Sequence, residues 1–170
     1  MPRREVLAWS YRELLANTAK LLQECIRAEA GAFMVYEACV IAGEIDWIWS
    51  PLGECVCVTC GVVAPWNGGN AAGPRKMNGG HYLSGRRPSL LLDERGIHPQ
   101  CEMCNGTKPG QLSGNSAAYE IYMQHCYGQK VCDQFRNLKN NVSKKWDRDE
   151  LYERRDQYRE RTKKAKARMR

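Results

Sequence analysis

Two short cysteine motifs decide the fold of this chain: Cys57-Val58-Thr59-Cys60-Gly61 and Cys101-Glu102-Met103-Cys104-Asn105. Each motif places two thiols three residues apart, which is the spacing of a metal-binding knuckle. Two knuckles supply the four thiolates of a tetrahedral zinc site and close the intervening residues into one loop. We therefore predict a structural zinc ion bound by Cys57, Cys60, Cys101 and Cys104.

The chain has nine cysteines, and one of the other five competes for this site. Cys55 lies two residues before the first knuckle, close enough to act as an alternative ligand. The remaining four lie in apolar patterns that we interpret as helix core: Cys25, Cys39, Cys126 and Cys132. The start of the chain does not resemble a signal peptide, so we expect a cytoplasmic protein that uses its thiols for metal rather than disulfides. The longest apolar run, residues 32–42, falls well short of the ~20 residues that span a bilayer, so no membrane partner is expected.

Charge is distributed unevenly along the 170 residues, which carry a net charge of +7. The net charge is −3 over residues 1–54, +4 over residues 55–143 and +6 over residues 144–170. A polyanion such as nucleic acid would meet the C-terminal part most favourably. A solvated basic tail without a partner remains the alternative.

Hydrophobic periodicity divides the chain into three regions. Residues 1–54 are expected to be helical, with a helix from about Ser10 to Ala30 that begins at a capping box and a second, buried helix over residues 33–43. This region either packs into the core or forms a dimer interface. Residues 116–170 are expected to form C-terminal helices that begin at Asn115, near Val131 and at Asp147, followed by a basic end at residues 162–170 that is free or lies on a phosphate backbone.

The central region, residues 55–115, is predicted to be an α+β unit framed by the two knuckles. Residues 75–83 predict a strand that leads to His81, and residues 90–92 a returning strand. A helix should begin near the second knuckle. Two strands and a helix on one zinc site make a ββα arrangement of the treble-clef type.

The residues between and beside the knuckles suggest phosphodiester hydrolysis. His81 follows two glycines that allow close approach, and a neutral imidazole can deprotonate water. Oxygen ligands suit Mg²⁺ or Mn²⁺, which would neutralise charge on the phosphate. We expect a convergent catalytic set of His81, Asp93, His98 and Asn105, with Asp93 and Asn105 binding the catalytic cation. We expect six cations to contact nucleic acid: Arg86, Arg87, Lys108, Lys144, Lys145 and Arg155.

The chain resembles a known family at these residues. The strings are Gly80-His81-Tyr82, Asp93 to Cys101, Cys104-Asn105, and Gly114-Asn115 with Tyr119 four residues on. Over residues 57–158 they are similar to the phage NinG (Rap) recombination proteins of the HNH, or His-Me finger, nuclease superfamily. The resemblance implies a zinc-stabilised ββα-metal (HNH) core and cleavage of branched DNA such as Holliday junctions and D-loops. It also implies that His81 is the general base and Asn105 a metal ligand.

Two positions depart from that family. Gly96 stands where the family has an asparagine that orients the base, and Gly80 stands where many relatives have a metal-binding aspartate. The first hypothesis is a metal-dependent endonuclease acting as a homodimer, because a four-way junction needs two symmetrical cuts. The second is a non-catalytic zinc module that binds nucleic acid or protein. A redox or metal sensor is a third, which the spare cysteines allow.

Overall fold

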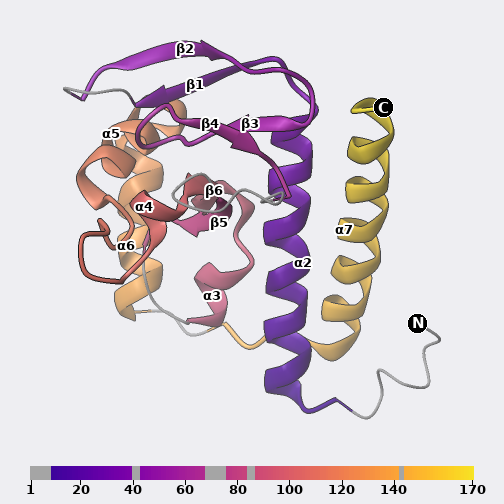
Figure 1. Cartoon of the computed structure of the whole chain (residues 1–170). Coiled ribbons are helices and arrows are strands. Elements are labelled where there is room, and N and C mark those ends of the chain that lie inside the picture. The colour runs from indigo at the N-terminus through magenta and orange to yellow at the C-terminus, as the bar shows by residue number, and fades with distance from the viewer. Residues whose placement is uncertain (1–8, 40–42, 68–75, 84–86, 142–143) are drawn as a thin grey trace.

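The computed structural model describes residues 9–39, 43–67, 76–83, 87–141 and 144–170 (Figure 1). The fold is α+β: two long helices pack side by side, and three two-stranded sheets and the shorter helices lie to one side of them. The long helices are α2 (Tyr11–Gly31) and α7 (Arg148–Arg168). No helix among these residues is both long and apolar enough to cross a membrane.

Helix α2 confirms the first predicted helix, including its capping box. The Ser10 side chain accepts a hydrogen bond from the Glu13 backbone at 3.3 Å, and the Glu13 carboxylate accepts one from the Ser10 backbone at 2.8 Å. Both contacts satisfy backbone donors that a helix start leaves unpaired. Every third or fourth residue is apolar, and the buried stripe includes Leu14, Leu22 and Cys25. This stripe forms a core with α7 and Ile97.

The predicted buried helix over residues 33–43 is wrong. The segment forms strand β1 (Val35–Cys39), which pairs antiparallel with β2 (Ile45–Trp49). Phe33, Met34 and Val35 are 51–54% exposed, so their apolar character does not reflect burial. Both segments contain β-branched and aromatic residues, which favour strands, and Gly43 has a positive φ of 83° that the connection uses. Residues 40–42 lie outside the described part of the chain.

The central region contains two further hairpins. Strands β3 (Glu54–Val56) and β4 (Val63–Pro65) flank the first knuckle. Strand β5 (Met77–His81) confirms the predicted strand and pairs antiparallel with β6 (Ile97–Cys101), with His81 opposite Ile97 and Gly80 opposite His98.

The expected returning strand at residues 90–92 is wrong. That stretch belongs to helix α3 (Pro88–Leu91), because Pro88 occupies a first-turn position, where its fixed φ favours a helix. A 3₁₀ turn, η1 (Glu94–Gly96), then leads into β6, and the one-turn helix α4 (Glu102–Asn105) begins at the second knuckle as predicted.

The C-terminal helices begin where the sequence predicts, and the last of them extends further than expected. Helix α5 (Ser116–Tyr127) ends at Gly128, which has a positive φ of 77°, and α6 (Gln129–Asn141) follows. Helix α7 begins with a capping box from Asp147 to Glu150 and continues to Arg168. The expectation that residues 162–170 lie free is wrong, because Thr162 and Ala165 are buried and Lys166 pairs with Glu24 of α2 at 2.9 Å.

Candidate metal centre and adjoining cavity

The four predicted zinc ligands meet at one point. The sulfur atoms of Cys57, Cys60, Cys101 and Cys104 all lie within 4.8 Å of one another. The Cys60 and Cys101 sulfurs are 3.7 Å apart, close to the ~3.8 Å edge of a tetrahedron with Zn–S bonds of ~2.3 Å. Cys55, the competing candidate, is buried on β3 but does not belong to the cluster. The residues therefore fit a structural zinc ion, and the zinc set predicted from sequence is assembled without Cys55.

The four thiols of this cluster shift one another's pKa values. Hydrogen bonds with Cys101 and Cys104 raise the pKa of the Cys57 thiol, whereas hydrogen bonds with Cys101 and Cys57 lower the pKa of Cys104. Four thiolates this close repel one another strongly. A bound Zn²⁺ would remove the remaining protons and neutralise that repulsion, so metal binding and folding should be coupled.

Polar groups around the cluster orient the thiols. The Thr59 hydroxyl lies 3.3 Å from the Cys57 sulfur. The Asn115 amide donates to the Thr59 carbonyl at 3.1 Å and to the Cys104 sulfur at 3.7 Å, so it links the two knuckles. Asn115 precedes α5 as predicted, but its side chain makes no helix-capping hydrogen bond and its backbone is left-handed. Its role is therefore to support the metal site.

His81 ends strand β5 beside helix α2. The two preceding glycines let other groups approach the strand closely. A Cβ atom on Gly79 would lie 2.7 Å from the Gln23 side chain of α2, and one on Gly80 would lie 2.0 Å from the Gln100 amide oxygen. The sequence predicted that other groups could approach the two glycines closely. In the structure Gln23 and Gln100 do so, and their side chains pack against the β5–β6 hairpin.

The protonation of His81 suits a general base. Burial lowers the pKa of its imidazole, and a hydrogen bond with the Leu91 backbone opposes that effect. The Nε2 atom is buried and has no hydrogen-bond partner among the described residues, so we assign the Leu91 contact to Nδ1. This leaves Nε2 of a neutral ring as the atom that can accept a proton. The Leu91 backbone thus contacts the imidazole of His81. The family resemblance assigns the orientation of this imidazole to an asparagine at the position of Gly96.

His81 opens into a cavity of about 460 Å³ next to the metal centre. Asn105, one residue after Cys104, lines the same cavity, so the structure brings these two predicted residues together. Lys139 of α6 also lines it, and the sequence did not reveal this residue, because it reads as an ordinary cation in the last turn of a helix. The other polar lining groups are Gln23, Tyr82, Thr107, Ser113 and Ser116.

His98 is separated from this cavity. It shares a hairpin face with Gly80, opposite to that of His81, and is 4% exposed. Its Nδ1 lies 3.0 Å from the Tyr119 hydroxyl and its Nε2 lies 3.0 Å from the Tyr127 hydroxyl. Burial lowers its pKa to about 3. The expectation that His98 converges with His81 is therefore corrected: His98 is a neutral, hydrogen-bonded core residue in this structure.

Asp93 is also not brought to His81 and Asn105. Its carboxylate caps the 3₁₀ turn and forms a bidentate contact with Arg95 at 3.1 and 2.8 Å. It lines a different cavity, together with Lys144 and Trp146. In this conformation Asn105 has no carboxylate beside it among the described lining residues of the His81 cavity.

The predicted nucleic-acid contacts fall into three groups. Arg87, Lys108, Lys144 and Lys145 are exposed. Arg155 is 2% exposed and stacks on the Trp9 ring at 4.6 Å, a position that does not present its guanidinium to a phosphate. Arg86 lies outside the described residues. Arg155 thus lies in the buried stripe of α7, where an arginine is rarely found, and the prediction that it contacts DNA did not allow for that burial.

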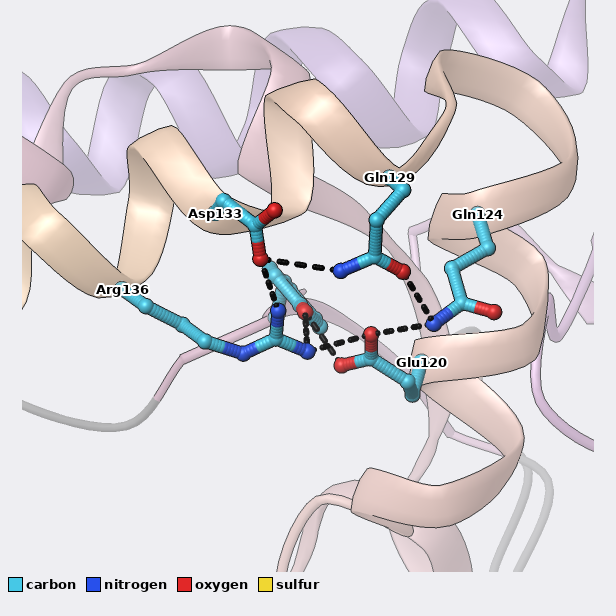
Figure 2. A network of polar contacts seen from close by, with 6 residues as sticks. Glu120, Gln124, Gln129, Asp133 and Arg136 are labelled. Carbon is cyan, nitrogen blue, oxygen red and sulfur yellow. Dashed lines mark hydrogen bonds and ion pairs between the residues drawn. The ribbon is translucent and has the colours of Figure 1, made fainter.

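Helix α5 holds both neighbours of His81. The Tyr119 hydroxyl donates to the Gly80 carbonyl at 3.0 Å, and the Tyr82 hydroxyl donates to the Glu120 carboxylate. Figure 2 shows how Glu120 is itself held by Arg136 of α6, within a network that includes Gln124, Gln129 and Asp133. Consecutive residues of one helix therefore fix the strand on either side of the candidate base.

Comparison with known proteins identifies the family. Residues 47–168 match the family described as "Bacteriophage Lambda NinG protein". The chain belongs to the NinG family. It is 32% identical over 87 residues to "Protein ninG" of Escherichia phage 933W, 31% identical over 87 residues to that of Escherichia phage lambda, and 35% identical over 66 residues to that of Enterobacteria phage H19B. The resemblance to NinG proteins inferred from the motifs is confirmed.

These matches cover 49%, 49% and 38% of this chain. They cover 36%, 35% and 31% of the relatives, so the chain matches about a third of the length of each NinG relative. No solved structure matches the chain significantly. Two residues of the motif strings, Asn115 and Tyr119, are those that contact Cys104 and His98, which gives these NinG motif positions a structural explanation.

Proposed function

We propose that this NinG protein is a metal-dependent endonuclease that cleaves branched DNA, such as Holliday junctions or D-loops, during phage recombination. The observation that carries the proposal is the shared cavity of His81 and Asn105 beside the four-cysteine cluster. A neutral imidazole with an unpartnered Nε2 can take a proton from an attacking water molecule. The adjacent Lys139 would hold a phosphate of the scissile strand.

The donor set partly fits a catalytic Mg²⁺ or Mn²⁺. The Asn105 amide oxygen and nearby hydroxyls are oxygen donors, but the described lining of the cavity contains no carboxylate. Mg²⁺ commonly keeps several waters and takes substrate phosphate oxygens as ligands. Asn105 would therefore bind the cation together with the DNA, and the ion would neutralise charge on the leaving oxygen. The four cysteines would hold Zn²⁺ as a structural ion.

Cleavage of a labelled four-way junction tests the proposal. The junction and a linear duplex of the same sequence are incubated with Mg²⁺ or Mn²⁺, with chelator, and with a His81→Ala variant. We expect cuts near the branch that need the cation and vanish in the variant. His125→Ala is the matched control, since His125 is exposed on α5 and its Nε2 lies 3.2 Å from the Glu37 carboxylate.

A non-catalytic zinc module is the second candidate. The missing carboxylate in the cavity favours it, as do Gly80 and Gly96 at positions where the family has functional side chains. Junction binding that His81→Ala leaves unchanged, with no cleavage in either cation, would select this candidate and refute the endonuclease. We further propose a homodimer, because paired cuts across a junction need two sites. Light scattering in the presence and absence of junction DNA measures its mass.

A further inference from the structure

A groove between α2 and α7 concentrates positive charge away from the His81 cavity. Its volume is about 470 Å³. Helix α2 contributes Leu21 and Glu24, α7 contributes the cations Arg159, Lys163 and Lys166, and Arg170 follows two residues after the end of α7. Three of them, Lys163, Lys166 and Arg170, belong to the basic end for which the sequence left a phosphate contact open, whereas Arg159 lies before it.

The spacing of these cations places them along one edge of α7. Steps of four and three residues keep Arg159, Lys163 and Lys166 on the same helix face, and Arg170 continues the series just beyond the helix end. The neighbouring face, with Leu151, Tyr158 and Ala165, is buried and packs against α2 (Figure 1). Because that packing fixes the orientation of α7, the cations form an ordered stripe about 16 Å long.

Part of the charge in the groove is already compensated. Lys166 pairs with Glu24 at 2.9 Å, and Arg159 pairs with the exposed Asp156 at 3.4 Å. Lys163 and Arg170 have no ion-pair partner among the residues that the structure describes. The groove therefore retains two uncompensated cations, and its two ion pairs can exchange their carboxylates for phosphates.

An acidic segment adjoins the groove: Lys166 stacks on Trp66 at 4.9 Å, and Glu29 pairs with Arg161 at 2.8 Å. Residues 28–74 contain no lysine or arginine and carry five acidic residues: Glu29, Glu37, Glu44, Asp46 and Glu54. This segment includes the β1–β2 hairpin with the exposed Trp47 and Trp49. The cations that a polyanion would meet at the groove therefore come from α7 and Arg170 and not from this neighbouring segment.

We infer that the groove between α2 and α7 binds the phosphate backbone of a nucleic-acid duplex, with Lys163 and Arg170 as its principal contacts. A duplex carries one charge per ~1.7 Å of axis, so a 16 Å stripe faces roughly nine phosphates. The site anchors an arm of the substrate and leaves the chemistry to the His81 cavity. The inference rests on the proposed function, because that function identifies the polyanion as DNA. Binding at the groove does not require that the protein cleaves the DNA.

Two double variants of the full chain on the same helix test this site. Lys163→Gln/Arg170→Gln removes two charges that line the groove. Lys164→Gln/Arg168→Gln removes two exposed charges of α7 that do not line it. Both variants have the same net charge and similar helix propensity. We would measure the binding of a labelled 20-base-pair duplex and of a four-way junction by fluorescence anisotropy at several salt concentrations. The measurements are made with chelator present and in a His81→Ala background.

The groove variant should bind about tenfold or more weakly at 0.1 M salt, and its log K against log salt slope should fall by about 1.8. The control variant should bind as the parent does. Equal losses in both variants would overturn the site, because they would report bulk charge alone. Tighter binding of an acidic peptide than of DNA, abolished by the groove variant, would also overturn it. If the protein binds DNA in this way but does not cleave it, the proposed endonuclease activity is refuted and the proposed binding site is retained.

Discussion

The Tyr119 hydroxyl lies 3.0 Å from the carbonyl of Gly80, the residue before His81, and donates its only proton to it. Tyr119 must therefore accept a hydrogen bond from Nδ1–H of His98, and Nε2 of His98 must accept one from Tyr127. With these donors and acceptors, His98 is neutral and has its proton on Nδ1. Through Tyr119 it positions the strand that carries the candidate base, His81.

Tyr119→Phe should destabilise the protein by about 1–3 kcal/mol, because it leaves the buried Gly80 carbonyl and the His98 Nδ1–H without their partner. Tyr127→Phe is the control, since it removes one contact to His98 and leaves Gly80 bonded. Urea unfolding measures both variants. If cleavage is observed, Tyr119→Phe should lower kcat more than Tyr127→Phe does. Equal effects of the two variants on both stability and kcat would show that the Gly80 contact has no positioning role.

One zinc ion per chain should be found by elemental analysis, and prolonged exposure to a strong chelator should unfold the protein. Four thiolates within 4.8 Å of one another are stable only around a cation. Cys104→Ser should lose zinc and cooperative unfolding. Cys55→Ser, which changes a buried thiol outside the cluster, should keep both. Full zinc content in Cys104→Ser would mean that the ligand set is wrong.

Acid should destabilise the protein through its buried histidines. Burial lowers the pKa of His98 to about 3 and also lowers that of His81, while an unfolded histidine titrates near 6.5. Below pH ~6.5 the unfolded state binds more protons than the folded state. Stability is therefore fully present above that pH and falls toward pH 3, by at most about 1.4 kcal/mol per pH unit for each histidine.

The contribution of His98 can be separated from that of the carboxylates by comparing variants. His98→Gln should be less stable at pH 7.5 but should show a shallower loss of stability between pH 6.5 and pH 4. His125→Gln, which changes an exposed imidazole on α5, is the comparison variant. An unchanged slope in His98→Gln would indicate that this histidine is not held neutral by burial.

An asparagine at position 96, which the resemblance to the family led us to expect, should destabilise this chain. A Cβ atom at position 96 would lie 2.3 Å from the Phe135 ring. Gly96→Asn should therefore cost about 1–3 kcal/mol through overpacking. The double variant Gly96→Ala/Phe135→Leu should be more stable than the sum of its single variants predicts. Additive effects would show that the two positions are not coupled.

Local patterns predicted the zinc set, the capped helices and strand β5 because each depends on residues close in sequence. Each of these signals involves residues only a few positions apart. They are the spacing of the cysteines, a serine three residues before a glutamate, and a glycine pair before His81. The faces of the β5–β6 hairpin depend on register, which the sequence did not give. His98 and His81 therefore appeared convergent although strand pairing places them on opposite faces. Lys139 reaches the cavity only because α6 packs beside Tyr82.

A buried helix was predicted in place of the β1–β2 hairpin because the apolar residues of this hairpin were expected to be buried. Their exposure can be tested. Trp47 and Trp49 are 66% and 64% exposed, whereas Trp146 is buried and donates to the Pro88 carbonyl at 2.7 Å. Trp47→Ser/Trp49→Ser should change the free energy of unfolding by less than about 1 kcal/mol and remove most acrylamide-quenchable fluorescence. Trp146→Ser should cost about 3 kcal/mol or more. A large loss of stability in the double variant would mean that a second copy or another segment covers this hairpin in solution.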